Sequence, residues 1–196
     1  MGNLAKLLTA LIVSCAMHLL VAQQSEDENG HSEMSHQHMH HKMDMDRDGM
    51  VMHANDSIVP KDCERISEDF EFEIKVGREY AEVGYTFGYD QHEFRVPGCS
   101  RIKVTLTNKD DVRHQWMVHG LPRYLYPQGM FHLEVNGRRT RAGTFIVPSD
   151  DRTYLIHCDM TQHMEKGLKA QLIVGGSKTD LPSIPGISGS NERDNY

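Results

Sequence analysis

Alternating apolar and charged side chains are the clearest signal along this chain. The stretch that begins at Asp69 reads DFEFEIKV, and this period of two predicts a half-buried β-strand. Residues 121–129 contain two prolines and read as a loop. Further strands are predicted at residues 79–87, 91–96, 101–107, 114–118, 131–135, 144–147, 152–158 and 168–174. Short strands separated by turn residues, with no long amphipathic helix, predict an all-β antiparallel sandwich or barrel.

The same pattern divides the 196-residue chain into four parts. Residues 1–22 read as a signal peptide, residues 23–60 as a flexible His/Met-rich segment, residues 61–176 as the β domain and residues 177–196 as a flexible tail. The second part is polar and has no sustained period, so it cannot bury enough apolar surface to fold alone. One domain with appendages is therefore expected.

The signal peptide has a positive start at Lys6, an apolar run over residues 7–21 and the small residue Ala22 before the cleavage site. This run is shorter than a transmembrane helix needs and is interrupted by polar residues. No stable membrane insertion is therefore expected after cleavage. A lipoprotein signal ending at Cys15 is the alternative. It is less favoured because the apolar run continues beyond that cysteine. Export implies an oxidising compartment.

Composition adds a metal-binding candidate. The chain has 13 His and 12 Met, and half of the methionines lie between residues 31 and 53. Thioether and imidazole groups bind copper, so this segment is expected to collect copper, against the alternative of a solvated linker with incidental composition. Its candidate ligands are His31, Met34, His36, His38, Met39, His40, His41, Met43, Met45, Met50, Met52 and His53.

Nucleic-acid binding and an EF-hand calcium site are both excluded by the sequence. The net charge is −7 and no basic run occurs, so nucleic acid is not an expected partner. Residues 44–49 match the opening of a calcium-binding loop. The twelfth position of that loop is Asn55 instead of glutamate and no flanking helices are visible, so we reject an EF-hand.

The four cysteines have different expected fates. Cys15 leaves with the signal peptide, and Cys158 lies among other metal-ligand residues. A disulfide between Cys63 and Cys99 is then expected, and a loop of that length would stabilise the fold by about 3–4 kcal/mol. The alternative is that one of these two pairs with Cys158, which would abolish a metal site there.

The candidate chemistry is centred on residues 154–174. A predicted strand leads into His157, Cys158, Met160, His163 and Met164, and a second strand follows. Cys158 and His163 on a short loop, joined by His114 from the start of a distant strand, would form a trigonal His₂Cys set. This set, with a weak axial position, is typical of electron-transfer copper sites.

Other interpretations of these residues are a buried thiol beside structural histidines, a zinc site, and a cysteine nucleophile with His163 as base. Zinc is disfavoured because structural zinc sites use four ligands from paired motifs, which are absent here. The nucleophile lacks an evident third orienting residue.

Several remaining histidines and methionines are interpreted as structural. Met117, Met130 and His132 could form a secondary copper site, but core packing of the two methionines is favoured over it. His157 faces away from Cys158 if strand alternation holds, and a partner copper bound by His157 with the N-terminal segment is the alternative. The residues taken as structural or surface groups are His92, His119 and His132, and the methionines assigned to packing are Met117 and Met130.

The motif Cys158-x4-His163, with an upstream His after an Asn-containing turn, resembles the cupredoxin family. The runs RHQWMVHGLP, PQGMF and HCDMTQHMEKG, behind a signal peptide and a His/Met-rich segment, look like the CopI-type periplasmic cupredoxins of bacterial copper tolerance. The resemblance covers about residues 61–176. It implies a Greek-key β-sandwich, a periplasmic location, copper as cofactor and the ligands His114, Cys158 and His163.

One position departs from this family. Its axial methionine would fall at residue 168, where this chain has Leu168. Either the copper has three ligands or another group, with Met164 as a candidate, takes the axial place. An apolar axial residue should favour Cu(I) and raise the potential.

The resemblance implies a role in copper tolerance, in which the protein sequesters copper and adds a weak Cu(I) oxidase activity. The alternatives are a soluble electron carrier for a respiratory or reductase partner, and a chaperone that delivers copper to an efflux system or an oxidase. The expected partners are copper ions and a periplasmic redox or copper-export protein. No other enzymatic activity is expected.

Overall fold

A computed structural model describes residues 43–188 of the chain. The signal peptide and residues 23–42 of the His/Met-rich segment lie outside the described residues. The described part contains strands and two short 3₁₀ turns. In chain order the elements are β1 (Met43–Asp46), β2 (Gly49–Met52), β3 (Asp69–Gly77), η1 (Arg78–Tyr80), β4 (Gly88–Tyr89), β5 (Glu93–Val96), β6 (Arg101–Asn108), β7 (His114–His119), η2 (Pro127–Gly129), β8 (Met130–Val135), β9 (Thr140–Ile146), β10 (Arg152–His157) and β11 (Lys169–Val174).

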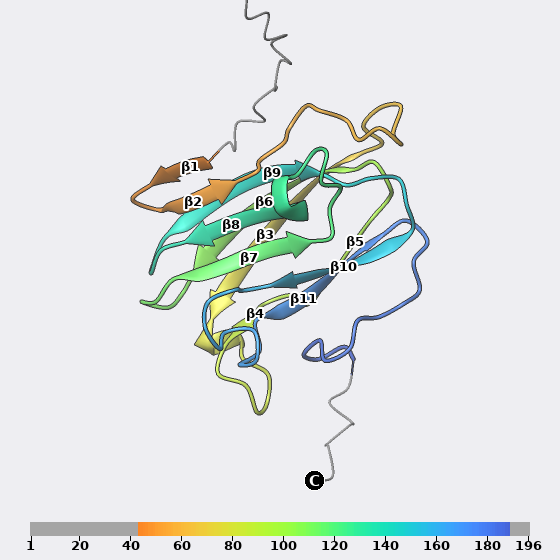
Figure 1. The fold of residues 1–196 in the computed structure, drawn as a ribbon. Helices are drawn as coiled ribbons and strands as arrows, with labels where there is room; N and C mark the ends of the chain where they lie inside the picture. The colour runs from red at the N-terminus through yellow and green to blue at the C-terminus, as the bar shows by residue number, and fades with distance from the viewer. Residues whose placement is uncertain (1–42, 189–196) are drawn as a thin grey trace, which may run out of the picture. The chain divides into compact units, whose positions relative to one another are not determined.

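The strands form two sheets, which confirms the predicted all-β sandwich (Figure 1). One sheet has the order β1-β2-β8-β7-β10-β11-β5, and the other has the order β4-β3-β6-β9. Two neighbouring pairs, β3 with β6 and β5 with β11, are parallel, whereas the sequence predicted antiparallel strands. Both parallel pairs join strands that are not consecutive in the chain, which a local hydrophobic period does not report.

The inward faces of the two sheets enclose one aromatic core. Trp116 on β7 is fully buried, and its ring centroid lies 5.9 Å from that of Phe94 and 6.0 Å from that of Phe145. On β10, Tyr154 and Ile156 are buried in the same way. Successive side chains of a strand point to opposite faces, so Trp116 and Ile156 define the inward side of β7 and β10.

Two segments differ from the sequence-based strand predictions. Residues 79–87 were predicted as a strand, but η1 and turns occupy this stretch, and β4 covers only Gly88 and Tyr89. Residues 43–52 lie within the segment expected to be flexible, yet they form the β1–β2 hairpin at the edge of the larger sheet. The hairpin is held by pairing of β2 with β8 and by the guanidinium of Arg141, which contacts the carboxylates of Asp44 and Asp46.

The cysteine pairing is confirmed. Cys63 and Cys99 form a disulfide, and Cys158 is free and buried. The alternative pairing of Cys158 is therefore wrong, and its sulfur remains available for chemistry.

The start of the expected tail packs on the β domain. Ile184 is fully buried, and the Leu181 N–H donates to the side-chain oxygen of Gln171 at 2.9 Å. Residues 189–196 lie outside the described residues. Between residues 43 and 188, no helix has the length and apolar character needed to cross a membrane.

Candidate metal centre

The fold brings together the three residues that the sequence analysis selected. His114 opens β7, Cys158 directly follows β10, and His163 lies on the loop between β10 and β11. Their ligand atoms all lie within 4.8 Å of one another. The ring Nδ1 atoms of His114 and His163 are 3.2 Å apart, and the sulfur of Cys158 is 3.6 Å from Nδ1 of His163.

These separations fit a single metal ion. A transition-metal ion such as zinc lies about 2.0–2.1 Å from a ligand nitrogen and about 2.3 Å from a ligand sulfur. Ligand atoms that are 3.2 and 3.6 Å apart can therefore share one ion. Two imidazoles and a thiolate are a soft donor set, suited to copper. His114, Cys158 and His163 therefore match a mononuclear copper ion in both distance and donor chemistry.

Asp110 fixes the orientation of the His114 ring. Its carboxylate accepts a hydrogen bond from His114 Nε2 at 2.9 Å, which leaves Nδ1 directed at His163 and Cys158. The turn that carries Asp110 is itself held by Asn108, whose side chain accepts the Asp110 N–H and donates to the carbonyl of Val112. A carboxylate behind a histidine ligand sets the tautomer and raises the basicity of the ring.

Burial controls the protonation of the three groups in the metal-free protein. It raises the pKa of the Cys158 thiol to about 11, although hydrogen bonds from the backbone N–H groups of Met160 and Gln115 oppose this rise. Burial lowers the pKa of His114 and of His163. At neutral pH the rings are therefore neutral and can bind a metal, whereas the thiol must first lose its proton.

The loop from Cys158 to Leu168 is a closed series of turns. The His163 N–H donates to the Met160 carbonyl at 2.9 Å, and the Leu168 N–H donates to the His163 carbonyl at 3.1 Å. Gly167 has a φ of +112°, and a Cβ there would lie 2.4 Å from the carbonyl oxygen of Phe87. Only glycine fits this close approach in that conformation. The loop thus holds His163 at a set distance from Cys158.

Phe87 covers the two imidazoles. Its ring centroid is 5.0 Å from that of His114 and 4.6 Å from that of His163. His114 and Cys158 are completely buried, whereas His163 is half-buried. The centre is therefore shielded from water on most sides, and His163 is the ligand candidate with the most access to solvent.

Leu168 is fully buried in the core cluster that also contains Cys158. Its carbonyl accepts the Cys158 N–H at 3.2 Å. Met164 is half-buried on the loop. The roles given to these residues, an apolar axial neighbour for Leu168 and a substitute axial ligand for Met164, remain predictions.

The geometry weighs against the two rival chemistries. A nucleophilic cysteine needs a lowered thiol pKa and access to substrate, but burial raises the pKa of Cys158 and the side chain is fully buried. Within residues 43–188, the converging group of His, Cys and acidic side chains supplies three ligands, one fewer than a structural zinc site uses.

The described members of the His/Met-rich segment are spread over the β1–β2 hairpin and the residue after it. Met43 and Met45 are exposed, Met50 and Met52 are half-buried, and His53 is buried with its Nδ1 3.0 Å from the Met130 carbonyl. None of these five residues belongs to the group formed by His114, Cys158 and His163. The other seven candidates, from His31 to His41, lie outside the described residues.

The histidines interpreted as isolated are not all isolated. His119 and His157 stack with their ring centroids 4.6 Å apart, and His132 lies on the neighbouring strand β8. Met117 lies between His132 and His157, on the sheet face opposite Trp116. Packing inside the sandwich therefore does not account for this methionine. Only His92 stands apart from this set.

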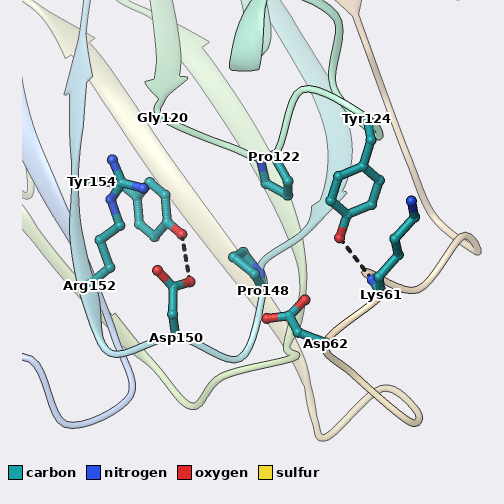
Figure 2. Close-up of a pocket in the computed structure, with 9 residues that line it drawn as sticks. All are labelled: Lys61, Asp62, Gly120, Pro122, Tyr124, Pro148, Asp150, Arg152 and Tyr154. Atoms are coloured by element: carbon teal, nitrogen blue, oxygen red, sulfur yellow. Dashed lines mark hydrogen bonds between the residues drawn. The ribbon is translucent and has the colours of Figure 1, made fainter.

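A cavity of about 330 Å³ lies at the other end of β7 and β10 (Figure 2). It begins where β7 ends and β10 starts, whereas His114 opens β7 and Cys158 follows β10. Six residues of extended strand, about 20 Å, separate the two ends, so this cavity is not an access route to the candidate centre. It is lined by Lys61, Asp62, Gly120, Pro122, Tyr124, Pro148, Asp150, Arg152 and Tyr154.

Asp110 and Phe87 are the site residues that the sequence analysis missed. Asp110 stands four residues before His114 in the same polar turn, and that spacing was an available signal. Phe87 lies 27 positions from His114 in the sequence and was assigned to a strand, so nothing local marked it as a cover for the imidazoles.

No protein-family model matches this chain, and no curated protein matches it. It is similar to solved structures that include auracyanin A, a "blue" copper protein from Chloroflexus aurantiacus, with 18% identity, a TM-score of 0.43 and coverage of 55% of this chain and 99% of that chain. Reduced auracyanin from Roseiflexus castenholzii matches with 21% identity, a TM-score of 0.43 and coverage of 55% and 96%.

A third similar structure is the multicopper oxidase mgLAC, with 18% identity and a TM-score of 0.46. The match covers 58% of this chain and 41% of the oxidase chain. All three identities are below 25% and all three TM-scores are below 0.5. The metal centre is therefore inferred from its side-chain geometry and not from these likenesses.

Proposed function

We propose that this protein is a copper-binding cupredoxin with a mononuclear centre formed by His114, Cys158 and His163. The observation that carries this proposal is the convergence of one sulfur and two imidazole nitrogens within 4.8 Å in a buried site. Two imidazoles and a thiolate in a trigonal set are the ligands of electron-transfer copper.

Copper in this site would supply one-electron chemistry. The chain contributes a rigid and largely buried environment: Asp110 holds the His114 ring, Phe87 covers both imidazoles, and the turns after Cys158 fix His163. Ligands held in this way need little movement when the charge of the site changes by one electron.

We further propose that the protein is exported and contributes to copper tolerance by sequestering copper, with slow oxidation of Cu(I) by oxygen or another one-electron acceptor. The export signal, the His/Met-rich segment and the resemblance to CopI-type proteins support this role. A soluble electron carrier is the second candidate, and the partial exposure of His163 favours it because a redox partner could approach the centre through that ring.

Metal analysis and an absorption spectrum of the copper-loaded full chain test the proposed centre. We expect a visible charge-transfer band that disappears in Cys158→Ser, because the band arises from the thiolate. His92→Gln is a matched control, since its half-buried ring lies outside the centre, and it should keep the band. A copper-loaded protein whose spectrum is the same with and without the Cys158 sulfur would refute the proposal.

Copper tolerance of cells separates the two candidate roles. The deletion should cover residues 23–42 and stop there, because residues 43–52 form strands of the larger sheet. A copper-sequestering protein should lose tolerance on this deletion, and also on Cys158→Ser. A dedicated electron carrier should leave tolerance unchanged in both variants and lose electron transfer in Cys158→Ser alone.

A further inference from the structure

The outer face of the larger sheet carries a second group of soft ligand residues. In the strand register, Met117 on β7 lies opposite His132 on β8 and opposite His157 on β10. His119 is two residues along β7 from Met117 and therefore shares its face. These four residues, named here the outer-face cluster, lie on three adjacent strands (Figure 1).

The cluster is buried although it lies outside the sandwich core. His132 and His157 are each 8% exposed, and Met117 is 3% exposed. In the part of the chain that the structure describes, no hydrogen-bond partner exists for the buried atoms Nε2 of His119, Nε2 of His132 and Nδ1 of His157. Buried polar nitrogens are normally paired, so three unpaired ones on one sheet face call for a ligand.

The imidazole spacing resembles that of the first centre. The rings of His119 and His157 have centroids 4.6 Å apart and an interplanar angle of 24°, while those of His114 and His163 are 5.0 Å apart. Among residues 43–188, His114, Cys158 and His163 form the group whose ligand atoms already converge. The outer-face rings must therefore rotate to close around an ion.

Further methionines extend the cluster toward the edge of the sheet. Met52 on β2 lies opposite His132, and Met43 on β1 lies opposite Met52. Met130 on β8 lies opposite His119. Because directly opposed residues point to the same face, a continuous row of thioether and imidazole groups runs from the exposed Met43 to His157.

We propose that His119, His132, His157 and Met117 bind a second metal ion, and that this ion is Cu(I). Three imidazoles and a thioether are neutral donors that suit copper, and the soft thioether favours Cu(I), whereas magnesium and calcium prefer oxygen ligands.

This site is separate from the proposed copper centre, although β10 serves both. His157 and Cys158 are consecutive, and strand alternation directs them to opposite faces of the sheet. The outer-face cluster contains no atom of Cys158, so a variant without that sulfur keeps the second site.

A Cu(I) titration of the full chain tests the second site. The background is Cys158→Ser, in which the first centre lacks its sulfur, and Cu(I) is added without oxygen in competition with the chromophoric chelator bicinchoninate. Adding His119→Gln and His132→Gln to this background should remove one bound Cu(I) per chain. The N-terminal segment is present in every variant, so its copper cancels in the difference.

His92→Gln in the same background is the matched control. Its Nε2 is also buried without a partner within the described residues, but it lies outside the cluster. This control should keep the full Cu(I) count, and the same count in the His119→Gln/His132→Gln variant would overturn the proposal. Circular dichroism checks that each variant is folded.

Met117→Leu supplies a test that preserves apolar packing. This substitution should lower the affinity for the second Cu(I) by roughly tenfold or more. Loss of even a residue that only supports a ligand lowers metal affinity by about 10–100-fold. Unchanged affinity in the folded variant would overturn the proposed ligand set.

Silver provides a direct readout, because Ag(I) is a redox-inert substitute for Cu(I). Ring ¹⁵N shifts of His119, His132 and His157 should change when Ag(I) is added to the Cys158→Ser protein. Shifts confined to histidines before residue 54 would contradict a site on β7, β8 and β10. Absence of the visible band in the wild-type protein would instead refute the first centre and leave this result standing.

Discussion

The two metal-ligand groups use opposite sides of β7 and β10 and differ in how firmly their rings are held. At the first centre, Asp110 anchors His114 from behind, and the loop turns position His163. In the outer-face cluster, each ring has a buried nitrogen without a hydrogen bond in the described part of the chain. The first group is therefore organised before an ion binds, whereas the second must rearrange to bind one.

A β-sheet can position metal ligands in two ways, either on a loop between strands or side by side on neighbouring strands. A loop closed by its own hydrogen bonds can set distances between side chains that are five residues apart, as for Cys158 and His163. Neighbouring strands set which side chains face each other, but they do not by themselves fix the rotamer of each ring. We therefore expect geometric selectivity at the first centre and adaptable binding of soft ions at the outer face.

The largest expected effect comes from removing a ring at the first centre. His163→Ala should lower the copper affinity of that centre by more than about 100-fold, because even residues that only support a ligand contribute about 10–100-fold to metal affinity. The visible band should be lost while the Cu(I) count of the outer face is unchanged. Copper titration followed by absorption measures both, and loss of the outer Cu(I) as well would show that the two groups are one site.

The pH dependence of copper affinity should also differ between the two groups. Burial raises the pKa of the metal-free Cys158 thiol to about 11, so at neutral pH metal binding must displace its proton. Copper affinity at the first centre should therefore rise with pH, by about tenfold per unit between pH 7 and pH 9. The outer-face cluster contains no thiol and should lack this slope.

Competition titrations at several pH values measure this slope, and an indicator dye reports the release of one proton per copper. Cys158→Ser should abolish the release. If the wild-type protein binds copper at this centre with a pH-independent affinity, its thiol is already ionised and the assigned effect of burial is wrong.

The anchor behind His114 should have an effect of intermediate size. Asp110→Asn removes the carboxylate charge that orients the ring, and copper affinity at the first centre should fall by about 10–100-fold. Asp111→Asn is the matched control, because Asp111 is exposed and pairs with Arg138 instead. Equal affinities of the two variants would show that Asp110 does not organise the centre.

The smallest expected effect concerns the loop. Gly167→Ala places a Cβ 2.4 Å from the Phe87 carbonyl oxygen and should cost about 1–3 kcal/mol of unfolding free energy. Gly84→Ala is the control, since Gly84 also has a positive φ but no atom lies within 4 Å of its Cβ position. Urea unfolding should show a greater loss for Gly167→Ala, and equal losses would mean that the contact with Phe87 does not constrain the loop.

Much of the fold was predictable because each strand carries its own alternation. The pattern from Asp69 onward marked β3, and the runs that became β6, β10 and β11 were found within a residue or two of their ends. The β1–β2 hairpin was missed because β1 is exposed along its whole length and β2 is only four residues long, with Gly49 and Val51 as its buried residues. Its place in the sheet depends on pairing with β8, which lies about 80 residues away.

The first centre was predictable in its residue types, whereas the sequence suggested only Met117 and His132 of the outer-face cluster, as part of a site that it disfavoured. His114, Cys158 and His163 were selected because a Cys and a His share a short loop and a His opens a distant strand. Asp110 and Phe87 complete the site through contacts that no local spacing specified.

The amino-acid sequence by itself determined the all-β character and the metal-binding types of the residues around Cys158, since these follow from composition and from periods of a few residues. That Cys158 is free was decided by the structure, which pairs Cys63 with Cys99. Only the tertiary structure decided which side chains meet. Strand register placed Met117 between His132 and His157, and the parallel pairing of distant strands completed the sheets. The physical reason is that pairing joins residues far apart in the chain, and its energy depends on the whole sheet.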